Sequence, residues 1–154
     1  MRLSIVLATL AALWAAPAAG ETKITIGAVE EVILLPWGIR LPARIDTGAT
    51  TSSIHTREVV VIGKEVELRL APDHGWEKIR LPIVRWKTIK TSEGKDLRPV
   101  VRLEICLSAH RFSAEVNVND RSEMKHPFLI GRDLLRGRFV VDVERQRLLP
   151  PRCP

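Results

Sequence analysis

The chain has 154 residues, enough for one domain with a single core and too few for two domains of ordinary size. Its 24 basic and 18 acidic side chains give a formal charge of +6, which suits acidic partners such as anionic polymers, lipid head groups or acidic peptides, and equally suits simple solubility. No basic stripe with interleaved aromatic residues occurs, so nucleic acid is not an expected partner.

Residues 1–20 have the pattern of a secretory signal peptide. Arg2 gives a positive start, an apolar run of about 14 residues follows from Leu3 to Ala16, and small residues then offer cleavage sites. The run is shorter than the roughly 20 residues of a spanning helix, and no later segment is long and apolar enough to span a membrane. We therefore expect cleavage between 18 and 20, a mature chain of formal charge +5, and a periplasmic or secreted protein.

Short runs of β-branched residues, separated by glycine and proline, predict an all-β domain over residues 21–144. One hairpin is expected in 58–70, with its turn at Gly63-Lys64, and a second has its tip at 92–95. The one expected helix is Arg132–Leu135, and the overall spacing favours a barrel or a sandwich. The remaining expected strands are 23–26, 29–35, 41–45, 78–86, 88–91, 97–107, 111–118 and 139–143. Strand 111–118 alternates, with Phe112, Ala114, Val116 and Val118 on one face.

The two cysteines and the C-terminal segment leave several alternatives open. Cys106 and Cys153 could form an intrachain disulfide, remain free thiols, or bridge two chains, and export permits a disulfide. An intrachain bridge would stabilise the fold by about 4 kcal/mol. The basic, proline-rich segment 145–154 is expected to be a tail, either a docking segment or a disordered end.

The strongest local signal is an acid at the end of an apolar strand. Asp46 follows Leu41–Ile45 and precedes Thr47-Gly48-Ala49, where glycine lets the backbone approach the carboxylate. Backbone N–H groups and nearby hydroxyl groups can donate to its oxygens and favour the ionised form. The tripeptide Asp-Thr-Gly alone is also typical of an ordinary turn. A second motif 85 residues later, an apolar strand followed by Gly131-Arg132-Asp133, makes the pair informative.

Together the two motifs resemble those of the retropepsin-like aspartic peptidases. Arg44–His55, Asn119–Arg132 and Gly137–Asp142 are similar, more closely, to a bacterial family often labelled ATP-dependent zinc proteases. The likeness covers nearly all of Lys23–Val143. It implies a small closed barrel of the retropepsin-like type with one short helix near the C-terminus. Some members of that family act on glutamate tails, so an acidic or polyglutamate peptide is an expected substrate.

The resemblance also implies roles for individual residues. Asp46 would be the catalytic acid, Thr47 would hydrogen-bond across a dimer axis, Gly48 would line the substrate and Ala49 would pack behind. The second motif would lie against this loop through Leu129, Ile130 and Gly131, and Arg132 would open the short helix.

Aspartic peptidases use two carboxylates that share one proton, and this chain has a single Asp-Thr-Gly. Asp133 is expected to be a cap or charge partner, and Asp142 a structural residue. We therefore expect a homodimer in which two copies of Asp46 meet. A peptide would bind between them as an extended strand, covered by the hairpin 88–98 or, alternatively, by 59–70. The candidate substrate-binding residues are the cations on and next to the hairpin 88–98: Lys87, Lys90, Lys95 and Arg98.

Neither zinc nor ATP follows from the residues. No His-Glu-x-x-His pattern or phosphate-binding Gly-rich loop occurs, so no metal or cofactor is predicted. His55 and His126 lie next to the two motifs and could flank the cleft, or be ordinary surface residues. The alternative function is a non-catalytic periplasmic binding module for anionic peptides or envelope polymers. A third interpretation is a partner of an envelope-bound enzyme that docks through its tail.

Overall fold

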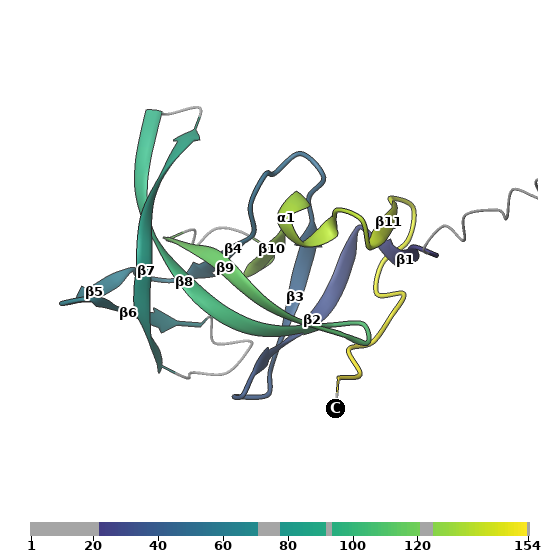
Figure 1. The fold of residues 1–154 in the computed structure, drawn as a ribbon, viewed down its shortest axis with the longest axis horizontal. Coiled ribbons are helices and arrows are strands. Elements are labelled where there is room, and N and C mark those ends of the chain that lie inside the picture. Colours follow the sequence, from purple (N-terminus) through teal and green to yellow (C-terminus); the bar gives the residue numbers. More distant parts are fainter. Residues whose placement is uncertain (1–21, 71–77, 92–93, 121–124, 154) are drawn as a thin grey trace, which may run out of the picture.

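The computed structural model describes residues 22–70, 78–91, 94–120 and 125–153, which form a nearly all-β chain with one short helix (Figure 1). The predicted signal peptide and residues 92–93 of the predicted hairpin tip lie outside these ranges. Within them, no helix has the length and apolar character needed to cross a membrane. The elements are β1 Ile24–Gly27, β2 Val29–Leu35, β3 Ile39–Ile45, β4 Ser53–Thr56, β5 Val60–Ile62, β6 Glu65–Arg69, β7 Lys78–Thr91, β8 Gly94–Leu107, β9 His110–Asp120, β10 Phe128–Ile130, α1 Arg132–Leu135 and β11 Phe139–Asp142.

Six strands form a closed ring. Their order is β2-β3-β10-β4-β9-β8, and β8 pairs back onto β2. Strands β7, β6 and β5 continue the sheet beyond β8, and β1 pairs separately with β11. The predicted all-β class is confirmed, and the predicted helix Arg132–Leu135 is present with the predicted bounds.

The core follows the alternation of apolar residues along the strands. In β9 the predicted inward face is buried throughout, as are the largest side chains of the neighbouring strands. Each such valine, leucine or isoleucine contributes roughly 1.5–3 kcal/mol when it is fully removed from water. The four residues of that predicted face are Phe112, Ala114, Val116 and Val118.

The hairpin of β7 and β8 extends away from the ring (Figure 1). The sequence predicted two strands, 78–86 and 88–91, but β7 is continuous and pairs with β8 as far as Thr91. The predicted break at Lys87 was wrong, because Lys87 pairs with Arg98 in an uninterrupted ladder, and the one register shift lies earlier, between Ile83 and Arg85. The β5–β6 hairpin does turn at Gly63-Lys64, where Gly63 has a φ of +62°.

Strand β4 was not predicted. Its sequence, Ser-Ile-His-Thr, lacks apolar alternation, yet all four residues are buried between β10 and β9. Pairing on both sides, rather than its own composition, makes this segment a strand.

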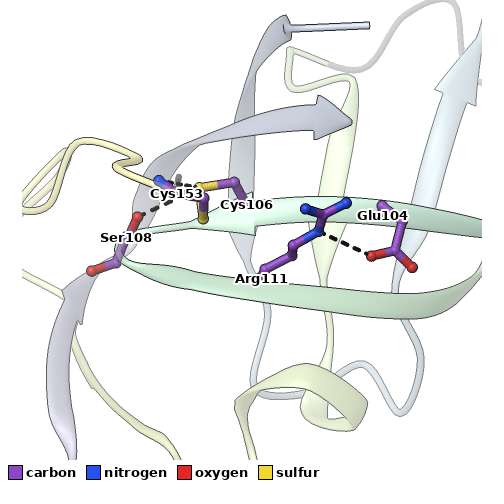
Figure 2. The surroundings of a disulfide bond; sticks show 5 residues. All are labelled: Glu104, Cys106, Ser108, Arg111 and Cys153. Carbon is purple, nitrogen blue, oxygen red and sulfur yellow. Dashed lines mark hydrogen bonds and ion pairs between the residues drawn. A yellow bond between two sulfur atoms is a disulfide. The ribbon is translucent and has the colours of Figure 1, made fainter. Parts of the chain in front are cut away.

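The segment 145–153 lies against the ring. Arg147 N–H donates to the Val29 carbonyl at 2.7 Å, and Arg152 N–H donates to the Ser108 carbonyl. Cys153 is bonded to Cys106 of β8, so the intrachain disulfide is the one of the three alternatives that the structure contains (Figure 2). In this structure the tail is neither a free end nor available as an unattached docking segment.

Candidate active site

Asp46 lies where β3 ends, in a loop that encloses its carboxylate. Its N–H donates to the Ile130 carbonyl of β10 at 2.9 Å. Its Oδ1 accepts from the N–H groups of Gly48 at 2.9 Å and Ala49 at 3.1 Å. Within the described residues, Oδ2 has no donor. The loop therefore orients one oxygen and leaves the other available for chemistry.

Gly131 allows the second motif to approach this loop. A Cβ atom at that position would lie 2.7 Å from the carbonyl carbon of Thr51 and 3.1 Å from the Ala49 oxygen. Its backbone, at φ −95°, is ordinary for any residue. The requirement for glycine is therefore one of space rather than of conformation.

Arg132 clamps the loop. Its guanidinium donates to the carbonyls of Thr47 at 2.8 Å and Gly48 at 2.7 Å, and to the Thr50 hydroxyl at 3.1 Å. Its own N–H donates to the Ala49 carbonyl at 2.9 Å. The sequence analysis gave Arg132 only the start of the helix. The fork of donors on arginine could have suggested that it also holds carbonyls.

Asp133 joins the helix to the far end of the same loop. Its carboxylate accepts from the Ser52 N–H at 2.9 Å and from the Ser52 hydroxyl at 2.8 Å. The Ser52 hydroxyl oxygen in turn accepts from the Gly131 N–H at 3.1 Å. Asp133 also accepts from the Leu134 N–H. It does not line the cleft that contains Asp46.

A cleft of about 490 Å³ lies between the Asp46 loop and the β7–β8 hairpin. Asp46 is the one carboxylate among the described residues of its wall, whereas three of the four predicted substrate-binding cations line it: Lys87, Lys90 and Arg98. The fourth, Lys95, pairs with Lys90 across the hairpin and does not line the cleft. No residue of the β5–β6 hairpin lines the cleft, so the β7–β8 hairpin is the one that borders it.

Two of these cations are fixed in place. The side chain of Arg98 is 8% exposed, and its guanidinium donates to Asp96 at 2.6 Å and to the Asn117 side-chain oxygen at 3.4 Å. Lys87 reaches across the cleft to the Thr51 hydroxyl at 3.2 Å. A cation that is held and shielded from water acts more strongly on a nearby anion than a mobile surface lysine does.

A second cavity of about 120 Å³ adjoins the cleft, and Leu129 contributes to both. His55 is buried there rather than on the surface, and His126 is half-buried. Burial lowers the pKa of His126, and nearby Lys125, Arg44 and Arg147 lower it further. The other residues of its wall are Arg44, Lys125 and Phe128. In the described ranges, no three His, Cys, Asp or Glu side chains gather as metal ligands would.

The site is a single carboxylate, held by loop amides at the wall of a basic cleft in an all-β protein. The family model of the RimB-like proteins, described as "Retropepsin-like aspartic endopeptidase RimB", matches residues 25–152. The chain therefore belongs to the RimB-like family of retropepsin-like aspartic endopeptidases, and the predicted family is confirmed. The match continues through most of the segment that the sequence analysis treated as a tail.

Curated relatives carry a different name. The chain is 30% identical over 132 residues to a probable alpha-L-glutamate ligase of Shewanella halifaxensis (strain HAW-EB4), covering 79% of this chain and 29% of the ligase. A second, from Parasynechococcus marenigrum (strain WH8102), is 28% identical over 134 residues, covering 79% and 28%. The chain thus spans less than a third of the length of these relatives.

A solved structure has the same fold. The chain resembles the crystal structure of Lpg0085, a protein of unknown function (DUF785) from Legionella pneumophila subsp. pneumophila str. Philadelphia 1. The TM-score is 0.67 at 25% sequence identity, and the match covers 82% of this chain and 98% of that one.

Proposed function

We propose that the chain is an aspartic endopeptidase of the cell envelope, in which two copies of Asp46 meet in a homodimer. The observation that carries the proposal is the position of Asp46, with one oxygen held by two loop amides at the wall of a 490 Å³ cleft. Membership of a peptidase family supports it. The ligase name belongs to proteins of which the match covers only 29%, and this sequence has no phosphate-binding loop motif.

The chemistry needs two carboxylates that share a proton. One Asp46 takes a proton from a water molecule while the water oxygen attacks the peptide carbonyl carbon. The other Asp46 donates a proton to the carbonyl oxygen. The C–N bond then breaks as the nitrogen receives a proton. Two carboxylates about 3 Å apart cannot both ionise cheaply, which keeps one proton on the pair. Thr47 and Gly48 are exposed on the same loop, so a second copy can reach it.

The charge of the cleft favours an acidic peptide. Lys87, Lys90 and Arg98 line the cleft together with Asp46, and Arg98 already has Asp96 as a partner. An anionic substrate would offset the repulsion between Lys87 and Lys90. The β7–β8 hairpin would cover a peptide bound as an extended strand. The predicted leader and the disulfide fit an oxidising compartment outside the cytoplasm.

The test is hydrolysis of a peptide panel, including acidic and polyglutamate peptides, from about pH 3 to about pH 8. Asp46→Asn should reduce kcat by about 10²-fold to 10⁴-fold or more, because the amide can neither take nor give the proton. Asp120→Asn is the matched control, since that carboxylate is exposed and lies outside the cleft.

The oligomeric mass of each variant is measured alongside by sedimentation. A dimer that cleaves peptide, and an Asp46→Asn dimer that does not, would support the proposal. Wild type and Asp46→Asn that bind the same acidic peptides and cleave none would instead support the binding module. Activity per chain that stays constant on dilution into a strictly monomeric state would exclude a dyad shared between two chains.

A further inference from the structure

The small cavity lies beside the proposed catalytic cleft on the same face of the sheet. Leu129 of β10 is in register with Arg44 of β3 on one side and Ser53 of β4 on the other. Residues in register point to one face, and so do residues two apart, which places Arg44 on the face of Asp46. Ser53 and Leu129 line the cleft, and Arg44 and Leu129 line the small cavity. The two cavities therefore lie on the same face of the sheet and share Leu129 in their walls.

The described part of this cavity's wall is basic and contains no carboxylate. Arg44, Lys125, His55 and His126 line it, together with Phe128 and Leu129. Neither Arg44 nor Lys125 has an ion pair with any residue that the structure describes. By contrast, Arg40 of the same strand, β3, has an ion pair with Glu31 on the neighbouring strand β2. Among the described residues, two cations without an ion pair thus lie beside the half-buried imidazole of His126, and no anion accompanies them.

The environment of His126 supports this conclusion. Its Nδ1 is buried and has no hydrogen-bond partner in the described part of the chain. Buried polar atoms in proteins nearly always have a partner, so this one is suited to a group that arrives from outside. Burial lowers the pKa of the ring, and the cations Lys125, Arg44 and Arg147 lower it further, so the described surroundings of His126 are cationic.

The size of the cavity limits the ligand. Its volume of about 120 Å³ is well below the roughly 300–1,000 Å³ of pockets that hold drug-sized molecules, so it fits a single side chain. Phe128 and Leu129 offer apolar contact for a short aliphatic stem, and Arg44 can hold a carboxylate with two donors.

We propose that this cavity is a subsite for one acidic side chain of the peptide held in the cleft, with Arg44 and Lys125 binding the carboxylate. The inference rests on the proposed function, because the cleft must hold an extended peptide for its neighbour to receive a side chain. It makes Arg44 and Lys125 specificity-determining residues for a position close to the scissile bond.

The test compares peptide pairs that differ only by Glu or Gln at one position near the cleaved bond. Wild type should favour Glu at one position by about tenfold in kcat/KM, the value of a single charge-assisted contact. Arg44→Gln and Lys125→Gln should lose most of this preference. Lys64→Gln removes the same charge from an exposed turn outside both cavities and should retain it.

A calorimetric titration of Asp46→Asn with the same peptide pairs separates this inference from the proposed function. Tighter binding of the Glu peptide that depends on Arg44 and Lys125, without cleavage by wild type, would uphold the subsite and reject the peptidase. Asp46-dependent cleavage with equal rates for Glu and Gln at every position would reject the subsite and leave the peptidase standing. A Glu preference that survives in both Arg44→Gln and Lys125→Gln would assign it to the cations of the main cleft and overturn the inference.

Discussion

Single side chains from the second motif hold the Asp46 loop in shape. Arg132 binds its carbonyls and Asp133 binds its last N–H, so a segment more than eighty residues away fixes the turn that presents the acid. The guanidinium of Arg132 donates to carbonyl oxygens of the loop, and the carboxylate of Asp133 accepts from a loop N–H. A loop with its backbone groups paired in this way is preorganised for chemistry.

Replacing Asp133 tests how much this pairing contributes. Asp133→Asn keeps the shape but turns one acceptor into a donor that faces the Ser52 N–H or hydroxyl. We expect the free energy of unfolding to fall by about 1–3 kcal/mol, measured by urea denaturation. Asp120→Asn, at an exposed carboxylate without a hydrogen-bond partner in the described residues, should change it little.

Ser52→Ala provides the cross-check. Ser52→Ala should lower the free energy of unfolding less in the Asp133→Asn background than in wild type, because Ser52 and Asp133 act on one interaction. Strictly additive losses would show that Asp133 stabilises the loop by another route.

At the scale of elements, the β6–β7 pairing carries a concentrated ion cluster. Glu67 of β6 is almost fully buried and binds Arg69 on its own strand at 2.9 Å and Arg80 on β7 at 3.1 Å. Lys78 lies at 3.7 Å. Hydrogen bonds from Arg69 and then Arg80 lower the pKa of Glu67 against the opposing effect of burial. The cluster anchors the strand from which the hairpin over the cleft continues.

The pH dependence of this cluster has a definite sign. A carboxyl pKa that is lower in the folded state stabilises the fold above the unfolded value of about 4.3, and the stabilisation disappears as pH falls through the folded pKa. Glu67→Gln should therefore lower Tm at neutral pH, and the difference from wild type should shrink below about pH 4. Glu65→Gln, at an exposed residue of the same strand without an ion pair in the described ranges, is the control. A gap that persists unchanged at low pH would assign the effect to packing.

The elements also show what the sequence could predict. Period-two alternation was sufficient for β9, and the Gly63-Lys64 turn between two β-branched runs was sufficient for the β5–β6 hairpin. It failed for β4, because Ser53–Thr56 is buried by its neighbours β10 and β9 and carries no pattern of its own. The Asp46 loop could be predicted because its residues are consecutive. The Arg44–Lys125 cavity could not, because it depends on the register between β3 and β10.

For the whole molecule, the C-terminal segment acts as a strap around the ring. Buried Glu30 accepts from the N–H groups of Gly27 at 2.6 Å, Leu148 at 3.1 Å and Leu149 at 3.3 Å. A Cβ atom at Gly27 would lie 2.5 Å from the Arg145 carbonyl oxygen, so the strap runs directly over β1. The composition of this segment suggested a solvated tail. No local sequence pattern shows that its N–H groups bind the carboxylate of Glu30, which lies 118 residues earlier.

The disulfide closes this strap, and its removal is the test at the molecular scale. Cys106 and Cys153 are 47 residues apart, so loop closure should stabilise the fold by about 4 kcal/mol on the chain-entropy model. We expect the double variant Cys106→Ser, Cys153→Ser to lose about this much in urea denaturation. Reduced wild type is the matched comparison, because Cys106 is fully buried and a serine hydroxyl there adds a cost of its own.

Hydrogen exchange separates the two anchors of the strap. If the disulfide mainly restricts the unfolded chain, the Leu148 and Leu149 amides should keep most of their relative protection after reduction, since Glu30 still accepts from them. Glu30→Gln with the disulfide intact should instead expose these two amides, because the side-chain amide replaces a carboxylate that three donors share. Loss of protection on reduction alone would mean that Glu30 holds the strap only while the covalent bond keeps it in place.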